Sequence, residues 1–359
     1  MNGLNLNTTM TTCNPTPFQC KIKNLDTDLW VLIDGKNAEF QSDKTIFEGV
    51  KIDTLENGLQ IHISENITVI KPIQIVSAIQ TKKPVKLSQQ FKIALEKNAT
   101  LTLVHCDDSL QKEQSNILNN VEIILAENAI LNYYKMENKD AGSILTNRIE
   151  VHQKSFSQFY SNVITFNAGK VNNFLHVNLN EPFADTQLNG LYLVDKKQEI
   201  SNEVKVYHHA PDCTSRQLYK GIADDEARTT FSGHIVVQKD AQHTAAYQIN
   251  KNIALTDLAH IHTQPFLEIY ADDVKCSHGA TIGQLDEDAL FYLRSRGVCQ
   301  KNARMLLMFA FANEVAQTVK IEALRERLSQ MIQQRLKGEL HICSQCALHC
   351  GEGRGVTFR

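Results

Sequence analysis

Short runs of apolar and β-branched residues recur along most of this 359-residue chain. From about Leu29 to Leu285 these runs are either alternating or continuously apolar, and Asn, Asp, Gly or Lys residues bound them. Runs of this kind predict β-strands. Examples are LTLVH (101–105), VEIIL (121–125), FLHVNL (174–179), EVKVY (203–207), HIVVQ (234–238) and FLEIY (266–270).

The strand pattern also repeats. Asn-Ala-Thr-Leu at 98–101 returns as Asn-Ala-Ile-Leu at 128–131, and His208, His234 and His260 follow one another at equal intervals. Repeats on this scale are typical of a parallel β-helix, whose coils stack like residues on like residues. A β-sandwich also has many short strands, but the spacing favours the β-helix. We therefore expect a mainly β fold, a right-handed parallel β-helix, in which the three histidines stack as a structural ladder.

Helical periodicity replaces the strand pattern near the end of the chain. Asp286 can cap a helix, and Gly297 is placed to end it. A second helical region is expected from about Asn302 to Gly338, with a bend near Thr318. Its apolar positions begin with Leu306, Leu307, Ala310, Phe311 and Val315.

The pattern divides the chain into four parts. We expect a loosely attached N-terminus (1–28), a parallel β-helix domain (29–285), a small helical domain (286–338) and an unstructured Cys-rich tail (339–359).

Composition narrows the classes of function. Hydrophobic residues make up 42% of the chain, enough for a buried core. The formal net charge of −3 gives no basic surface for nucleic acid, and no apolar run reaches the length of a membrane span. The N-terminal sequence has neither an apolar signal core nor an Arg-rich transit pattern. Nine irregularly spaced cysteines argue against a disulfide framework, so a reducing cytoplasm is expected.

Cys276 and His278 are the strongest candidates for chemistry. They lie two positions apart in a predicted strand, so both side chains leave the same face. A thiol beside an imidazole suits iron, zinc or iron–sulfur chemistry. The structural alternative for Cys276 is a small apolar residue inside a coil. For His278 the alternative is a hydrogen-bonded strand histidine.

Two weaker groups of metal-ligand residues accompany this pair. His260 and His262 share one strand face and form a second candidate pair. In the tail, Cys343, Cys346 and Cys350 have the density of a zinc or cluster site. The tail lacks a second ligand pair, however, and an incidental extension is favoured there.

Several segments together resemble the SufB/SufD family of the Suf iron–sulfur cluster assembly machinery. Four carry the likeness: NEVKVYHHAPDCTSRQLYKGI (202–222), ARTTFSGHIVVQKDAQHTAAYQINKNIAL (227–255), DDVKCSHGATIGQLDEDALFYLRSRGV (272–298) and ARMLLMFAFANEVAQTV (303–319). SufB-like chains carry a Glu-His-Glu-type run in the strand and a cysteine in the following helix. Here KCSHGAT (275–281) and FYLRSRG (291–297) resemble the SufD branch instead.

The resemblance extends in order from about Trp30 to Gly338. Family members usually begin with a helical N-terminal domain, which we expect to be missing or shortened in this chain. The Cys-rich tail has no counterpart in the family pattern.

The resemblance implies a scaffold subunit without enzymatic activity. It implies a SufB-like partner joined through the β-helix and a SufC-like ATPase held by the C-terminal helices. A transient iron–sulfur cluster or iron would be shared with the partner, with His278 and Cys276 as ligands from this chain. The sequence has no G-x-x-x-x-G-K-[ST] motif, which fits ATP hydrolysis by a partner. Flavin binding to the complex and pairing of two copies of this chain stay open.

Two other functions compete with the scaffold. A polysaccharide-acting β-helix enzyme needs clustered carboxylates, whereas the acids on the predicted strands are scattered. A free-standing metal-binding protein would use the Cys-rich tail. Co-purification with an ATPase and a SufB-like chain, sugar turnover, or metal retained by the isolated chain would distinguish the three.

Overall fold

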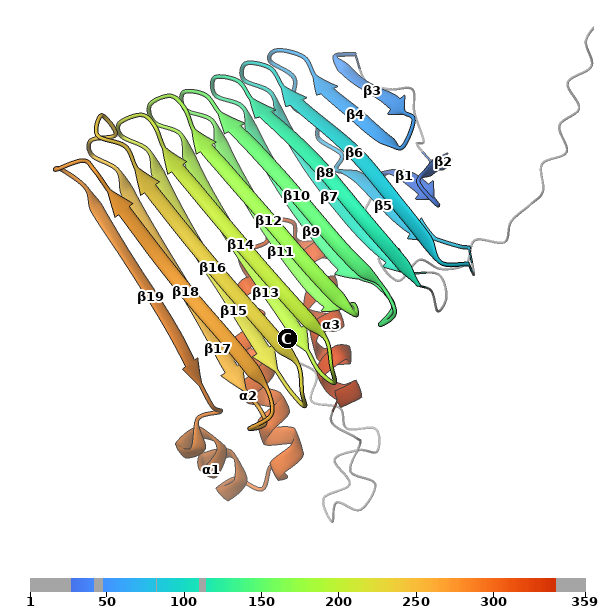
Figure 1. The fold of residues 1–359 in the computed structure, drawn as a ribbon, viewed down its shortest axis with the longest axis vertical. Helices are drawn as coiled ribbons and strands as arrows, with labels where there is room; N and C mark the ends of the chain where they lie inside the picture. The colour runs from blue at the N-terminus through green and yellow to red at the C-terminus, as the bar shows by residue number, and fades with distance from the viewer. Residues whose placement is uncertain (1–26, 42–47, 82, 110–113, 340–359) are drawn as a thin grey trace, which may run out of the picture.

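The protein is mainly β, a parallel β-solenoid of about seven turns followed by three helices (Figure 1). The computed structural model describes residues 27–41, 48–81, 83–109 and 114–339. Two sheets form the walls of the solenoid, and the chain alternates between them, so that odd-numbered and even-numbered strands separate from β5 onward. The β-helix predicted from the spacing is confirmed, and the sandwich alternative is wrong.

Sheet A contains ten strands. In spatial order they are β19 (Lys275–Gly283), β17 (Ala245–Ala254), β15 (Thr214–Ala223), β13 (Asp185–Val194), β11 (Gln158–Asn167), β9 (Ile130–Asn138), β7 (Thr100–Ser109), β5 (Ile73–Ile79), β1 (Asp28–Ile33) and β2 (Lys36–Gln41). All neighbours are parallel except the β1–β2 hairpin.

Sheet B contains nine strands. In spatial order they are β18 (His260–Ile269), β16 (Arg228–Val237), β14 (Glu199–His208), β12 (Lys170–Leu179), β10 (Ile144–Gln153), β8 (Ser115–Leu125), β6 (Val85–Leu95), β4 (Gly58–Ile63) and β3 (Val50–Leu55). Again only the N-terminal pair, β3–β4, is antiparallel.

The corners of the coils explain the repeated Asn-Ala segments. Leu101 pairs with Leu131 one coil later, as the repeat predicts. Asn98 and Asn128 both have a φ of +58°, the left-handed conformation that asparagine tolerates better than most residues. The Asn98 side-chain amide also donates to Asn66 Oδ1 of the preceding coil at 2.7 Å. The repeat therefore marks two left-handed corners that asparagine suits, although later corners with the same conformation hold Phe156 and Phe183.

The predicted histidine ladder is wrong. His208 pairs in register with Val237, and His234 pairs with Lys205, so the histidines are offset between coils. His260 pairs with Arg228. The coil length also varies, because the step along the chain from β10 to β12 is shorter than the step from β16 to β18. A fixed interval along the chain therefore does not stay in register through this part of the solenoid.

Helix α1 (Glu287–Ser295) begins as the sequence predicts. The Asp286 side chain accepts a hydrogen bond from the Ala289 amide at 2.9 Å, and Gly297 follows the helix with a φ of +87°. Among its apolar residues only Leu290 is buried, whereas Phe291 and Tyr292 are exposed.

The second helical region consists of two helices, α2 (Gln300–Ala316) and α3 (Glu322–Glu339), and not of one bent helix. Thr318 ends the first by donating its hydroxyl to Val315 O at 2.7 Å and Asn162 Oδ1 at 2.8 Å. The Lys320 amide then donates to the Tyr134 hydroxyl at 3.2 Å. Contacts with sheet A thus replace the helical hydrogen bonds that would have continued α2.

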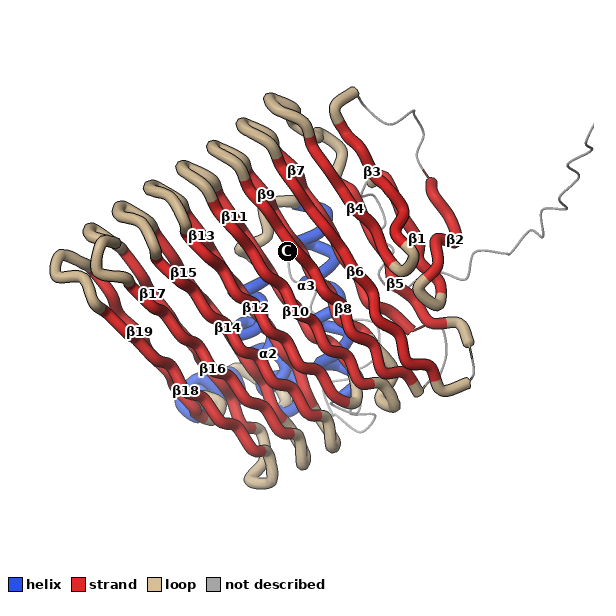
Figure 2. Tube along the Cα trace, turned by 45° about the horizontal axis from the view of Figure 1, so that its top comes forward, coloured by secondary structure: helices blue, strands red, loops and turns tan. Residues whose placement is uncertain are grey.

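Helices α2 and α3 lie along the outer face of sheet A (Figure 2). This creates a second apolar core beside the one inside the solenoid. From the helices it receives Met308, Phe309, Ala312, Val315, Leu328 and Ile332, and from the sheet Val104, Cys106, Tyr134, Met136, Ile164 and Leu191. The central strands of sheet A are therefore buried on both faces.

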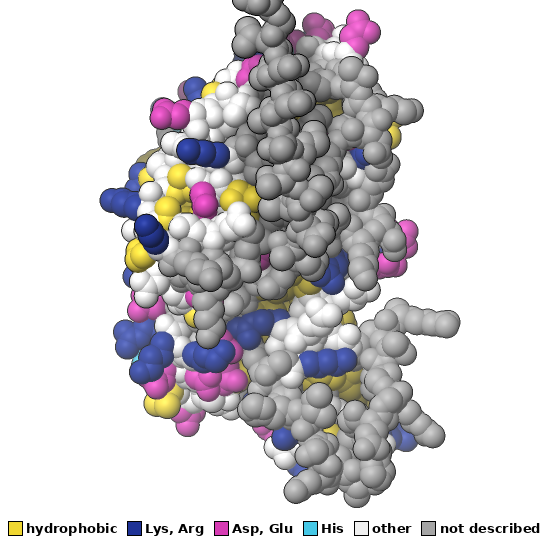
Figure 3. Space-filling model, turned by 90° about the vertical axis from the view of Figure 1, so that its right-hand side faces the viewer, with side chains coloured by type: hydrophobic (Ala, Val, Ile, Leu, Met, Phe, Trp, Pro, Cys, Tyr) yellow, Lys and Arg dark blue, Asp and Glu magenta, His cyan; other side chains and the backbone are white. Residues whose placement is uncertain are grey.

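The described surface offers no field of a single charge sign on the face drawn in Figure 3. Basic, acidic and hydrophobic side chains are interspersed there, in agreement with the small net charge. Among the described helices, none combines the length and the apolarity that crossing a membrane requires.

Candidate functional site

The two ends of the solenoid differ. At the N-terminal end, sheets A and B finish in the antiparallel hairpin strands β2 and β3. At the other end the last strands are β18 and β19, and no described strand continues either sheet (Figure 1). An edge of this kind presents backbone N–H and C=O groups that can pair with another chain. We call this pair of edge strands the open end.

His278 lies in β19, within the open end, and its imidazole is exposed. In register it follows Gln248 of β17, which is buried inside the solenoid. Because parallel neighbours in register point to the same face, His278 belongs to the inward-facing row of sheet A. It is exposed because no further coil covers that row. The imidazole therefore stands at the mouth of the solenoid interior.

Cys276 lies on the same inward face of β19, as predicted from its spacing to His278. It is partly buried and packs against an apolar cluster that includes Ala246 and Ile235. Burial raises the pKa of the Cys276 thiol, with a hydrogen bond from the Ala246 amide acting in the opposite direction. Unaided, this cysteine is a protonated thiol, so a metal would have to displace the proton before the sulfur could ligate it.

The weaker candidates do not join this pair. His260 and His262 share a face of β18, as predicted, but they follow Arg228 and Thr230 on the outside of sheet B. They therefore point away from the interior row that contains His278.

Cys343, Cys346 and Cys350 lie outside the described residues. Within the described ranges, no three His, Cys, Asp or Glu side chains are close enough to hold a metal ion.

A groove runs between the C-terminal helices. It encloses about 1130 Å³ and has both apolar and charged walls. Leu306, Leu307 and Ala310, which the sequence pattern placed on the apolar stripe of the helix, line this groove and are only partly buried or exposed. The sheet-facing side of α2 is instead formed by Met305, Met308, Phe309 and Ala312. Helix α2 thus has apolar residues toward both the sheet and the groove, which the sequence pattern did not separate.

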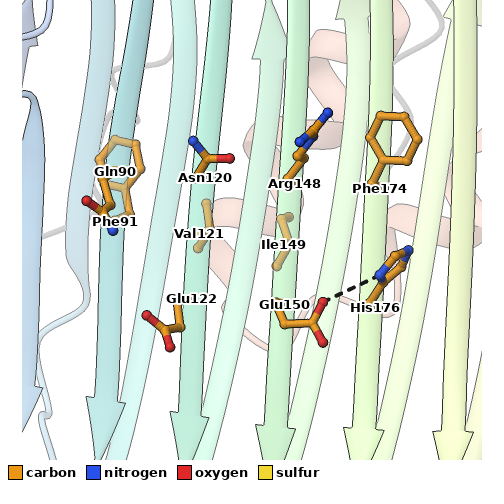
Figure 4. Close-up of a pocket in the computed structure, with 10 residues that line it drawn as sticks. All are labelled: Gln90, Phe91, Asn120, Val121, Glu122, Arg148, Ile149, Glu150, Phe174 and His176. Carbon is orange, nitrogen blue, oxygen red and sulfur yellow. Dashed lines mark ion pairs between the residues drawn. The ribbon is translucent and has the colours of Figure 1, made fainter.

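A second groove, of about 540 Å³, crosses the outer face of sheet B (Figure 4). Figure 4 shows Arg148 and Phe174 along one row, and Glu150 beside His176 along the next. Glu150 is already engaged by His176 Nδ1 at 3.4 Å and by the Asn178 amide at 2.6 Å. The groove was not foreseen, because these residues read in sequence as the solvated positions of alternating strands.

Comparison with known proteins points to one family. The family model described as "SUF system FeS cluster assembly, SufBD core domain" matches residues 78–311. A SufBD family protein of Synechocystis is 30% identical over 298 residues, which cover 80% of this chain and 65% of the relative. The iron–sulfur cluster assembly protein SufD of Escherichia coli is 40% identical over 160 residues, 45% of this chain and 38% of that protein.

A SufBD family protein of Mycobacterium leprae is 34% identical over 169 residues, 45% of this chain and 43% of the relative. The chain thus matches less than two thirds of the length of each of these relatives.

Proposed function

Because this chain belongs to the SufBD core family of the SUF iron–sulfur cluster assembly system, we propose that it is a non-catalytic scaffold subunit on which a nascent cluster forms jointly with a partner chain. One observation carries the proposal. His278 is exposed on an edge strand at the mouth of the solenoid, where a second chain could complete the ligand set.

The partner proposed for the open end is a SufB-like subunit. Edge strands β18 and β19 offer two rows of backbone groups for strand addition. Large apolar side chains also remain exposed around them, namely Phe266, Ile269, Tyr270 and Ile282. Exposed apolar residues gathered at a sheet edge favour association with another protein. Pairing of two copies of this chain through the same edge is the competing assembly.

The cargo of this interface would be iron or a transient iron–sulfur cluster. Imidazole from this chain and thiolate from the partner would form a mixed ligand set, which is less thiolate-rich than the usual four-cysteine set. Cys276 would contribute only after losing its proton to the incoming metal. A ligand set divided between two chains can be opened by separating them, so that the cargo is held and later released.

The groove between α1, α2 and α3 is the proposed docking surface for a SufC-like ATPase. Its apolar residues Leu293, Leu306 and Leu307 are flanked by Glu314, Glu322, Arg325 and Glu326. This mixture of apolar floor and charged rim is typical of a protein interface. The helices are firmly attached to sheet A, since Arg335 binds Asp195 through two ion-paired contacts of 2.9 and 3.2 Å. Movement of a docked ATPase would therefore be passed to the solenoid.

Reconstitution of the complex tests the scaffold function. We expect His278→Ala to abolish cluster formation with a SufB-like partner and a SufC-like ATPase, measured by cluster absorbance, while both partners still co-purify. His262→Ala is the matched control, because His262 is also exposed on an edge strand but faces outward. Normal cluster formation by the His278→Ala complex would refute the assigned role.

A further inference from the structure

The interior row behind His278 is polar and incompletely hydrogen-bonded. Gln217, Gln248 and His278 follow one another in register on β15, β17 and β19. Gln217 and Gln248 are 3% and 1% exposed, and neither side-chain amide has a hydrogen-bond partner among the described residues. Burying an amide without partners is energetically costly. Two such amides directly behind the candidate ligand therefore call for an explanation.

The space around Gln248 is shaped by the opposite sheet. Its amide reaches across the interior to Gly233 of β16, where an added Cβ would lie 2.0 Å from Gln248 Nε2. Because Gly233 has no Cβ, the interior has space for the Gln248 side-chain amide and for its rotation. The terminal torsion of glutamine is soft, so Gln248 can reorient toward the neighbouring coil at little cost.

A row of asparagines in the same solenoid shows in-register amides that bond along the solenoid axis. On the interior of sheet B, Asn119, Asn147, Asn173 and Asn202 occupy one row on successive coils. Each of the first three amides donates to the next coil, with distances of 2.8, 2.9 and 3.1 Å. Polar side chains that are neighbours in this row are therefore close enough to bond along the solenoid axis. Gln248 and His278 are neighbours of the same kind.

We infer that Gln248 is a positioning residue for His278, its Oε1 accepting the N–H of the imidazole. This inference rests on the proposed function, because it concerns the nitrogen that would bind iron. An acceptor on one ring nitrogen fixes the proton there and leaves the other nitrogen unprotonated and available as a ligand. Gln248 would thus hold the imidazole in one tautomer and orientation at the open end.

Gln248→Met tests the inference, because methionine has a similar length and flexibility but offers only a weak acceptor in place of the amide oxygen. The ¹⁵N spectrum of the full-length isolated chain at about pH 8.5, where an ordinary imidazole is neutral, reports the tautomer of each histidine. Comparison with the His278→Ala spectrum identifies the signal of His278. Gln217→Met is the matched control, since Gln217 is equally buried but lies two coils from His278.

We expect one dominant His278 tautomer in the wild type and in Gln217→Met. In Gln248→Met the ratio should approach that of the exposed His260, and cluster formation in the complex should slow by about tenfold or more, the usual effect of losing a group that orients a metal ligand. An unchanged tautomer ratio in Gln248→Met would overturn the inference.

Full-rate cluster assembly despite a changed tautomer would also overturn the positioning role, provided that His278→Ala still abolishes assembly. If His278→Ala itself assembles clusters normally, the proposed function fails instead. A tautomer change in Gln248→Met would then still support the hydrogen bond. The spectrum and the assembly assay therefore separate the two failures.

Discussion

Replacing Lys135 tests whether the charges inside the solenoid are compensated as the structure indicates. Lys135 and Asp107 face each other in the interior, 2.5 Å apart, with side chains 0% and 1% exposed. Glu137 lies in the same interior and accepts hydrogen bonds from Asn147 at 2.7 Å and Thr165 at 2.5 Å. The Lys135 ammonium therefore pairs with one buried carboxylate, and its charge also acts on a second buried carboxyl group. We expect Lys135→Met to destabilise the protein strongly.

The magnitude follows from the loss of this compensation. Burial acts to raise the pKa of Asp107, but Lys135, together with His105 and Lys139, outweighs it, and the pKa lies below its ordinary value. Without Lys135 the buried carboxylate loses its ion-pair partner and keeps the Asn119 amide hydrogen bonds, or it must take up a proton. Removing one partner of a buried ion pair costs about 3–5 kcal/mol. The double change Lys135→Met with Asp107→Asn removes both charges and should recover most of that loss.

Equilibrium unfolding in urea measures these differences. Trp30 is the single tryptophan and is 6% exposed in β1, so its fluorescence reports the first coil. Circular dichroism reports the strands of the whole solenoid, and agreement of the two probes establishes one transition. A Lys135→Met protein within about 1 kcal/mol of the wild type would refute the reasoning. So would a double variant no more stable than the single one.

Two further predictions concern the interior. Burial raises the pKa of Glu137 to about 7, against the Thr165 hydrogen bond and the Lys135 charge. The protonated form of Glu137 is therefore favoured in the folded state. Its contribution of about 3 kcal/mol to the free energy of unfolding is fully present below about pH 4.5 and is lost as pH rises through 7. Glu137→Gln should remove this slope from the unfolding free energy measured between pH 5 and 8. Gly221→Ala should cost about 1–3 kcal/mol in urea unfolding, because its Cβ would meet the Tyr192 ring at 2.0 Å. The control Gly279→Ala meets nothing within 4 Å and should be nearly neutral.

The sequence predicted the elements better than it predicted which face of a strand is buried. The Asn-Ala repeat was readable because a left-handed corner restricts the residue type at Asn98 and Asn128. Alternation also placed Cys276 and His278 on one face. The histidine ladder failed because corner loops of different length change the coil repeat, and an interval counted along the chain does not register those changes.

The buried charged side chains inside the solenoid were not predicted from the sequence either, and the reason is different. In β7 and β9 the consecutive residues 103–108 and 133–137 are all buried, since the helices cover the outside of sheet A. Alternation then no longer separates an inner from an outer face, and Asp107, Lys135 and Glu137 read as surface positions. The unpaired amide of Gln248 was missed for another reason, because burial does alternate along β17 at this position. Its meaning depends on its neighbour in register, His278, which lies a whole coil later in the sequence.

The two ends of the solenoid suggest why stability and the proposed function would be located in different coils. In a stacked fold each coil is stabilised mainly by its neighbours. The middle coils have a neighbour on both sides, and the Asn119–Asn202 row and the Lys135 pair add polar contacts that depend on register. The last coil has one neighbour, and its inward face is left partly exposed at Cys276 and His278.

A partner that adds the next strands would bury this face and complete a ligand set in the same step. Binding of the partner and binding of the metal would then stabilise each other, as a site that must assemble and later come apart requires.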